Sequence, residues 1–140
     1  MAMRLMSEIV RDQRPVTMRP SATVADACRA MRDRRVGAVL VTDEDLHLLG
    51  IFTGRDAVCR VLAERKDADR TRLAEAMTRE PRTIAVEKTA IDALRLMQEG
   101  GFRHVPVVSR DKVVGIASHG DFRGLETARL DDETDFWERL

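Results

Sequence analysis

The sequence lacks the features that mark secreted and membrane proteins. Its 140 residues include only two cysteines, Cys28 and Cys59, which form no CxxC or Cys/His pattern. No run of apolar residues approaches the roughly 20 that a membrane span needs. The N-terminal residues alternate charged with apolar side chains, unlike a secretory signal peptide. We therefore expect a cytoplasmic protein with no membrane partner, whose cysteines are structural thiols kept reduced.

Common catalytic and metal-binding patterns are also missing. No Ser-His-Asp or Cys-His set is apparent, and no glycine-rich loop has the form that cradles phosphates. The three histidines are scattered and have no carboxylate partner at ligand spacing. We expect no enzyme activity, no metal site and no cofactor that the protein requires.

The balance of charges argues against a strongly polarised surface. The chain has 24 Lys and Arg residues and 24 Asp and Glu residues. Nucleic acid is therefore an unexpected partner, because proteins that bind it usually carry a basic face. Charged residues make up 34% of the chain and hydrophobic residues 44%, which is typical of a globular domain. The length suits one ordinary domain with a substantial core.

What the sequence does contain is an internal repeat of about 60 residues. Residues 50–56 return in altered form as residues 115–121, and in both copies an apolar strand breaks into a helix. The two halves share residues at strand, cap and turn positions: Pro15 and Pro81, Thr17 and Thr83, Asp26 and Asp92, Met31 and Met97, Val39 and Val105, Val41 and Val107. One supersecondary unit is therefore used twice.

Hydrophobic patterning predicts the same order of elements in both halves. The first half reads as a lead-in turn (5–11), a strand (15–18), a helix opened by residues 21–23, two strands (36–41 and 48–52) and a helix (56–63). The second reads as a lead-in helix (73–77), a strand (82–86), a helix (90–98), two strands (103–108 and 113–117) and a helix from Gly120. Each repeat is thus β-α-β-β-α, and we expect an α+β fold with pseudo-twofold symmetry.

The repeats predict the boundaries along the chain. Residues 1–66 form the first repeat with its lead-in helix, residues 67–126 the second, and residues 127–140 an amphipathic tail. The charged stretch 64–71 is expected to be a solvated linker. The end of the chain carries Phe136, Trp137 and Leu140, an apolar cluster that needs cover from its own core or from a second subunit.

Both repeats end in one pattern: glycine, a hydrophobic residue, any residue, Thr or Ser, two further residues and Asp. Two such endings, each after a β-hairpin and before a helix, resemble the CBS domain pair, or Bateman module, over roughly residues 5–125. Val105-Pro106-Val107 after Arg103 and His104 also resembles this family, whereas residues 39–41 lack the proline. The chain looks like a stand-alone module of the bacterial type, without an attached catalytic domain.

The resemblance implies two related clefts between the repeats that bind an adenosine-containing ligand, such as AMP, ADP, ATP, NAD or S-adenosylmethionine. In each cleft the aspartate would accept hydrogen bonds from the ribose hydroxyls. One cleft would use Ser118 and Asp121 with Val16, Val36, Gly37 and Ala38. The other would use Thr53, Arg55 and Asp56 with Thr83, Phe102, Arg103 and His104, of which Arg55, Arg103 and His104 are the phosphate candidates.

The resemblance also implies partners. Members of this family commonly pair through their helices, which predicts a homodimer through residues 57–62 and 122–125. A regulatory module without catalytic residues would also need a protein effector, whose identity the sequence does not reveal.

A ligand-free homodimerisation or scaffolding module is the alternative. Four pairs in the sequence have the form of helix capping boxes: Thr23 with Asp26, Thr53 with Asp56, Thr89 with Asp92, and Ser118 with Asp121. A hydroxyl that caps a helix is also well placed at the edge of a cleft, so the two roles can coexist. His104 is as readily a structural histidine as a phosphate contact.

Overall fold

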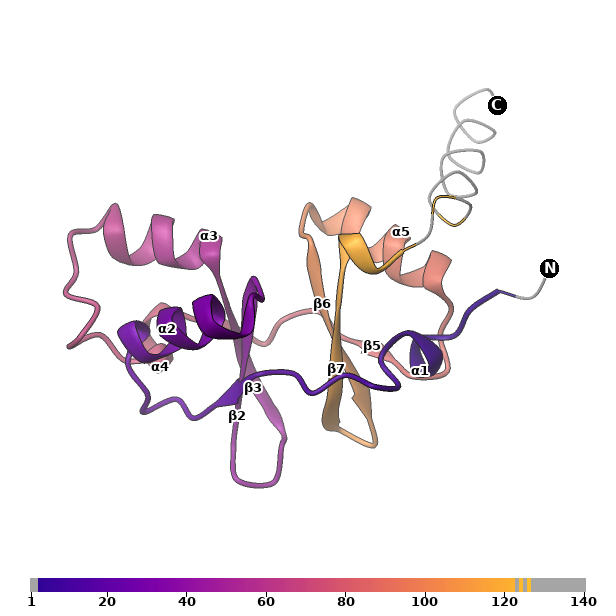
Figure 1. The fold of residues 1–140 in the computed structure, drawn as a ribbon, viewed down its shortest axis with the longest axis horizontal. Coiled ribbons are helices and arrows are strands. Elements are labelled where there is room, and N and C mark those ends of the chain that lie inside the picture. The colour runs from indigo at the N-terminus through magenta and orange to yellow at the C-terminus, as the bar shows by residue number, and fades with distance from the viewer. Residues whose placement is uncertain (1–2, 123, 125, 127–140) are drawn as a thin grey trace. The chain divides into compact units, whose positions relative to one another are not determined.

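The computed structural model describes residues 3–122, 124 and 126, which form two compact units (Figure 1). The first, which we call the Thr53 unit, takes its described residues from 14–81 and 110–113. The second, the Ser118 unit, takes them from 1–13, 82–109 and 114–140. Helices and mixed sheets occur in both units, so the predicted α+β class is confirmed.

The Thr53 unit is built on a four-stranded sheet. Its strands are β1 (Thr17–Met18), β2 (Ala38–Thr42), β3 (Leu48–Thr53) and β4 (Thr78–Arg79), in that order across the sheet. β1 lies parallel to β2, and the other neighbours are antiparallel. All five residues of β2 are buried, as expected for a nearly all-apolar strand inside a sheet.

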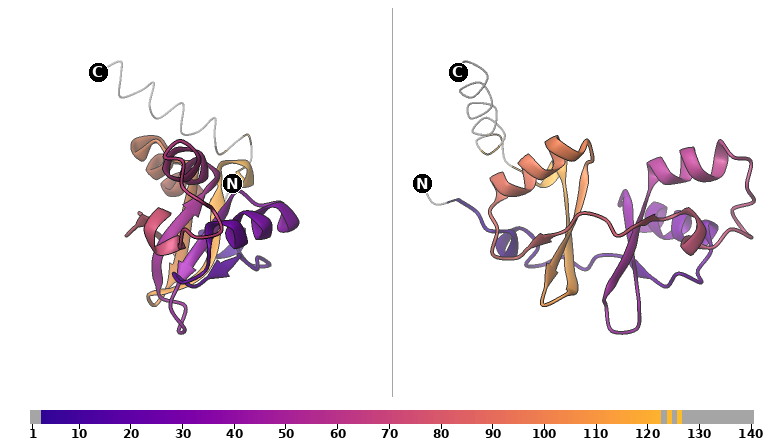
Figure 2. Two further views of the ribbon diagram at one scale, coloured as in Figure 1. Left: turned by 90° about the vertical axis from the view of Figure 1, so that its left-hand side faces the viewer. Right: turned by 180° about the vertical axis from the view of Figure 1, so that it is seen from behind.

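The helices of this unit lie on one side of β2 and β3 in Figures 1 and 2. They are α2 (Val24–Arg34), α3 (Gly54–Asp56), which continues into η1 (Ala57–Leu62), and α4 (Leu73–Ala76). η1 has the wider hydrogen bonding of a π-helix. The core between helices and sheet includes Phe52, Val61 and Leu73, none of which is more than 2% exposed.

The Ser118 unit has a three-stranded sheet in the order β5 (Ile84–Ala85), β6 (His104–Ser109) and β7 (Lys112–Ser118). α1 (Met6–Ile9) and α5 (Ala90–Gly100) lie on one side of β6 and β7 (Figures 1 and 2), and η2 (His119–Asp121) follows β7. α5 ends at Gly101, whose φ of 69° lies in the left-handed region that glycine adopts readily.

Each lead-in segment packs with the other repeat, and not with the one that it precedes. In the Ser118 unit, the Met6 N–H donates to the Lys88 carbonyl at 2.8 Å, and the Met6 side chain is fully buried. In the Thr53 unit, the Leu73 N–H donates to the Ala22 carbonyl at 2.8 Å. The lead-in helix of the first repeat, α1, therefore belongs to the Ser118 unit, and that of the second repeat, α4, to the Thr53 unit. The predicted boundaries at residues 66 and 126 follow the repeats and stay a prediction.

Two local expectations need correction. The charged stretch 64–71 is not simply solvated, because Thr71 is only 6% exposed and its carbonyl accepts the Val24 N–H at 2.8 Å. The Ala68 carbonyl accepts the Ala25 N–H at 3.0 Å in the same way, so the stretch closes the start of α2. β4 has no counterpart among the predicted strands, because two residues are too short to show an alternating pattern.

The end of the chain falls largely outside this description. The predicted tail with Phe136, Trp137 and Leu140, and residues 123 and 125 of the predicted interface, lie outside the described residues. Within the described residues, no helix is both long and apolar enough to cross a membrane.

Candidate functional site

The first motif closes a capping box at the junction of β3 and α3. The Thr53 backbone is still extended, with φ of −118° and ψ of 169°, and its hydroxyl oxygen accepts the Asp56 N–H at 3.3 Å. In return, Asp56 Oδ2 accepts the Thr53 N–H at 3.0 Å and the Thr53 hydroxyl at 3.2 Å. The capping role predicted for this pair is confirmed.

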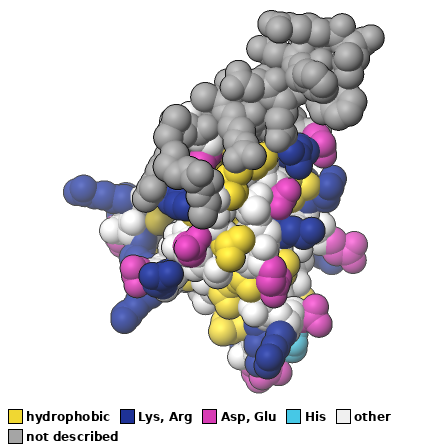
Figure 3. Space-filling view, turned by 90° about the vertical axis from the view of Figure 1, so that its right-hand side faces the viewer, with side chains coloured by type: hydrophobic (Ala, Val, Ile, Leu, Met, Phe, Trp, Pro, Cys, Tyr) yellow, Lys and Arg dark blue, Asp and Glu magenta, His cyan; other side chains and the backbone are white. Residues whose placement is uncertain are grey.

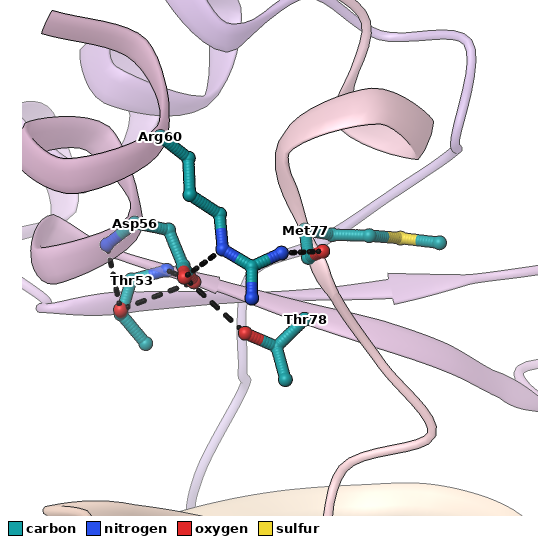
Figure 4. A network of polar contacts seen from close by, with 5 residues as sticks. All are labelled: Thr53, Asp56, Arg60, Met77 and Thr78. Atoms are coloured by element: carbon teal, nitrogen blue, oxygen red, sulfur yellow. Dashed lines mark hydrogen bonds and ion pairs between the residues drawn. The ribbon is translucent and has the colours of Figure 1, made fainter. Parts of the chain in front are cut away.

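The second oxygen of Asp56 also has partners, which Figure 4 shows. The Thr78 hydroxyl, at the start of β4, donates to Oδ1 at 3.2 Å. Arg60 Nε lies 3.5 Å from the same oxygen, and Arg60 Nη1 donates to the Met77 carbonyl at 2.9 Å. Asp56 is only 8% exposed, and a buried carboxylate is tolerated in a protein when such partners surround it.

The second motif has the same bonds from the hydroxyl residue to the aspartate, with fewer other partners. Ser118 ends β7 in an extended conformation, and Asp121 Oδ2 accepts its N–H at 2.7 Å and its hydroxyl at 3.2 Å. Within the described residues, no hydrogen bond or ion pair reaches Asp121 Oδ1. Arg4 Nη2 donates instead to the Asp121 backbone carbonyl, at 3.1 Å. As far as the described residues go, one carboxylate oxygen of this motif is available as an acceptor.

The other two predicted capping boxes differ from each other. Thr89 and Asp92 form a complete box, with hydrogen bonds of 3.2 Å and 3.0 Å in the two directions. Thr23 accepts the Asp26 N–H at 3.1 Å, and the Asp26 carboxylate pairs with Arg29 at 2.7 Å. The hydrogen bond with Arg29 and weaker ones with Thr23 lower the pKa of Asp26.

The start of each hairpin lies beside the motif of its own repeat. The Gly54 N–H donates to the Gly37 carbonyl at 3.3 Å, which places residues 36–38 next to Thr53. The His119 N–H donates to the Arg103 carbonyl at 3.1 Å, which places Arg103 next to Ser118. The predicted clefts combine residues across the repeats, and thus across the two units, so those combinations stay a prediction.

The remaining predicted site residues differ in exposure. Val16 is half-buried against the core of the Thr53 unit, and Phe102 is half-buried against that of the Ser118 unit. Arg55, Thr83 and Arg103 are exposed. The two arginines are therefore free to reach an anionic ligand, whereas Phe102 already serves the core.

His104 is a neutral side chain at neutral pH. Burial of the ring lowers its pKa below the ordinary value, and the neighbouring Arg103 charge lowers it further. The Asp121 carboxylate partly offsets both effects by favouring the charged ring. His104 can therefore donate one N–H to a ligand, but it would not supply a positive charge to a phosphate at pH 7.

Three features of the surface bear on metals and partners. No group of three His, Cys, Asp or Glu side chains among the described residues could hold a metal ion. On η1, Val58 is 56% exposed and Leu62 69% exposed, whereas Val61 is buried. On the face drawn in Figure 3, basic and acidic side chains are interspersed, as the balanced composition suggests.

Sequence reasoning missed the residues that surround the two aspartates. Arg60 stands four positions after Asp56, a spacing that places an acidic and a basic side chain on one helix face, so a signal for it existed. Thr78 and Arg4 come from distant segments and carry no comparable local signal.

Comparison with known proteins gives consistent matches over both repeats. Residues 3–62 and 73–126 match the sequence profile of the CBS domain. The CBS domain-containing protein CBSCBSPB2 of Arabidopsis thaliana is 41% identical over 107 residues, which cover 76% of this chain and 20% of that protein. The chain thus corresponds to only a fifth of the length of this curated relative.

Two solved structures are similar over nearly their whole length. A CBS-domain containing protein from Agrobacterium tumefaciens is 31% identical with a TM-score of 0.77, over 89% of this chain and 98% of that chain. A CBS domain protein from Pyrobaculum aerophilum, complexed with AMP, is 25% identical with a TM-score of 0.81, over 91% of this chain and 98% of that chain.

Proposed function

The chain belongs to the CBS domain family, with two copies of the domain, and on this basis we propose that it is a regulatory protein that binds an adenosine-containing ligand. The ligand is AMP, ADP, ATP, NAD or S-adenosylmethionine, and the bound state is passed on to a protein effector without catalysis. The AMP complex of the Pyrobaculum relative supports this class of ligand.

The observation that carries the proposal is the arrangement of Ser118 and Asp121. Two hydrogen bonds from Ser118 hold Oδ2 of the carboxylate, while Oδ1 has no partner among the described residues. A carboxylate fixed in this way is a ready acceptor for the two adjacent hydroxyls of a ribose. Exposed Arg103, beside the same motif, supplies a positive charge for a ligand phosphate.

A ligand shifts an equilibrium only through different affinities for two states. If the ligand also contacts the opposite repeat, through the predicted residues Val16 and 36–38, its binding would favour one arrangement of the two repeats. The effector would then recognise that arrangement. Ligand affinity measured on variants of Val16 and of residues 36–38, and on variants of Asp121, tests whether the ligand contacts both repeats.

Thermal-shift titration tests the proposal directly. The purified protein, shown to be free of co-purified nucleotide, is titrated with the five adenosine ligands, and with GTP as a control for the base. Saturable stabilisation by an adenosine ligand and not by GTP is expected, because a ligand that binds only the folded state raises the melting temperature. Stabilisation by none of the five ligands would overturn the proposal.

Self-association through η1 is a second function that a specific observation favours. Val58 and Leu62 are four residues apart, so they share a helix face, and both are largely exposed. A second copy of the chain is the expected cover for this face. Leu62→Lys should shift the protein to monomer in sedimentation measurements, whereas Leu46→Lys, in an exposed hairpin turn, should not. A wild-type monomer at micromolar concentration would exclude this function.

A further inference from the structure

The two Thr/Ser-x-x-Asp motifs share a sequence pattern but differ in how their carboxylates are engaged. An ionised carboxylate offers about four lone-pair sites to donors. In Asp56, Oδ2 receives the Thr53 N–H and hydroxyl, and Oδ1 receives the Thr78 hydroxyl and lies 3.5 Å from Arg60. A ribose would have to displace these internal partners from a side chain that is 8% exposed.

Displacement would disturb more than one hydrogen bond. Thr78 pairs with Ile51 in the ladder between β3 and β4, and Arg60 also holds the Met77 carbonyl. The carboxylate of Asp56 thus fastens β4 and the end of α4 to the end of β3 (Figure 4). A ligand on Oδ1 would leave Arg60 without its carboxylate and would loosen this edge of the sheet, both of which oppose binding.

The second motif lacks both partners because of its sequence. Four residues after the aspartate, the first motif has Arg60 and the second has Leu125. α4 and α1 correspond, since Glu75 and Glu8 each bond back to the N–H that precedes the helix. Three residues after that glutamate, the first copy has Thr78 and the second has Arg11. Leucine therefore replaces the arginine at the first of these places, and an exposed arginine replaces the hydroxyl at the second.

The sheet edge beside the second motif is also closed differently. In the Thr53 unit, β4 pairs with β3 at Ile51. At the corresponding position of the Ser118 unit, the Ile116 N–H of β7 donates instead to the Gln13 side chain, at 2.9 Å. Arg4 anchors the motif through the Asp121 carbonyl, at 3.1 Å, and not through its carboxylate. The backbone at Asp121 is thus fixed while Oδ1 stays open among the described residues.

We propose that the protein binds one adenosine ligand per chain, at the Ser118–Asp121 motif, and that the Thr53–Asp56 motif is a structural fastening for β4 that takes no ligand. This inference rests on the proposed function for its binding half. Its structural half stands on the contacts of Asp56 alone and can be tested without any ligand.

Calorimetric titration with AMP and with ATP tests the binding half on the wild type and on Asp121→Asn and Asp56→Asn. We expect one site per chain, at least a tenfold loss of affinity in Asp121→Asn, and an affinity within about twofold of wild type in Asp56→Asn. Two sites per chain would overturn the inference. So would loss of binding in Asp56→Asn while Asp121→Asn still binds.

Urea unfolding of the same three proteins tests the structural half. Asp56→Asn should lower the midpoint clearly more than Asp121→Asn, because it weakens contacts to Thr78 and Arg60 that Asp121 does not have. If Asp56→Asn fails to fold, Thr78→Val, which removes one hydroxyl at nearly constant volume, replaces it in both measurements. Equal midpoints for the variants of the two motifs would overturn this half. Absence of binding by any protein would count against the proposed function and the binding half together, and the unfolding comparison would still decide the structural half.

Discussion

Arg4 and Glu126 form a bidentate ion pair, with Arg4 Nη2 2.6 Å from Oε1 and Nε 3.1 Å from Oε2 of Glu126. The two side chains are only 24% and 10% exposed. The same guanidinium donates to the carbonyl of Asp121. A residue near the start of the chain thus fixes the backbone of the candidate ribose-binding motif near its end.

Removing this arginine should weaken both the fold and the site. Arg4→Met keeps much of the side-chain volume but leaves the Glu126 carboxylate without this partner. We expect a loss of about 1–3 kcal/mol of stability in urea unfolding, together with weaker nucleotide binding. Arg11→Met, at an exposed position of the same segment, is the matched control. A stability loss no larger than that of the control would show that the ion pair contributes little.

The glycines of the two repeat endings should resist substitution because a chain segment lies against them. A Cβ on Gly50 would stand 2.5 Å from Met77 Sδ and 2.9 Å from the Thr78 carbonyl oxygen, and a Cβ on Gly115 would stand 2.6 Å from Val10 Cβ. Gly50→Ala and Gly115→Ala should each cost about 1–3 kcal/mol of unfolding free energy.

Gly54→Ala is the control for these two substitutions. Among the described residues, no atom outside the adjoining backbone lies within 4 Å of a Cβ at this position, and alanine favours the helix that begins there. Its unfolding midpoint should equal or slightly exceed that of the wild type. If Gly54→Ala destabilised the protein as much as Gly50→Ala, close packing would not be the reason for the loss.

His104 should make the protein less stable in mild acid. Because burial lowers its pKa in the folded state, the unfolded chain binds a proton more readily as the pH falls through about 6.5. The contribution of the neutral ring is therefore complete above that pH and is lost progressively below it. His104→Gln should lose less melting temperature than wild type between pH 7.5 and about pH 5.5. Parallel curves for the two proteins would assign the acid sensitivity to other groups.

The stability of α5 should depend more on the acidic residue of its first turn than the stability of α2 does. Asp92→Ala breaks the reciprocal bond to the Thr89 N–H and should cost about 1 kcal/mol. Asp26→Ala should cost less, because the Asp26 carboxylate pairs mainly with exposed Arg29 and its contact with Thr23 is weaker. Equal losses in thermal unfolding would mean that the charge near the helix start matters more than the returning hydrogen bond.

Much of the fold could be predicted because its signals are local. The apolar run of β2 and the one-sided apolar pattern of α2 each reflect the surroundings of a single element. β4 could not be predicted in this way, since its two residues form a strand only through pairing with β3. The burial of Thr71 was missed for the same reason, because the residues beside it in sequence are charged while its carbonyl closes a helix some distance back along the chain.

The candidate site was predicted in part. Thr53, Asp56, Ser118 and Asp121 were recognised from the repeated ending, and their hydrogen bonds within each motif follow from the spacing of three residues. The difference between the two motifs was not recognised, although Arg60 and Leu125 could have been compared at matching positions. The comparison indicates a difference between the two carboxylates only once the structure shows that Arg60 lies beside Asp56.

Local sequence patterns are enough to predict the internal repeat, the order of elements in each half and the pairing of hydroxyl with aspartate at each turn. These properties depend on residues a few positions apart, whose spacing the chain geometry converts directly into contact. Which aspartate keeps an oxygen without a partner among the described residues is set by long-range contacts. That difference depends on Thr78, which β4 brings to Asp56, and on Arg4, which binds the Asp121 carbonyl and forms no hydrogen bond with its carboxylate among the described residues. Long-range packing sets both contacts, so no local pattern encodes them.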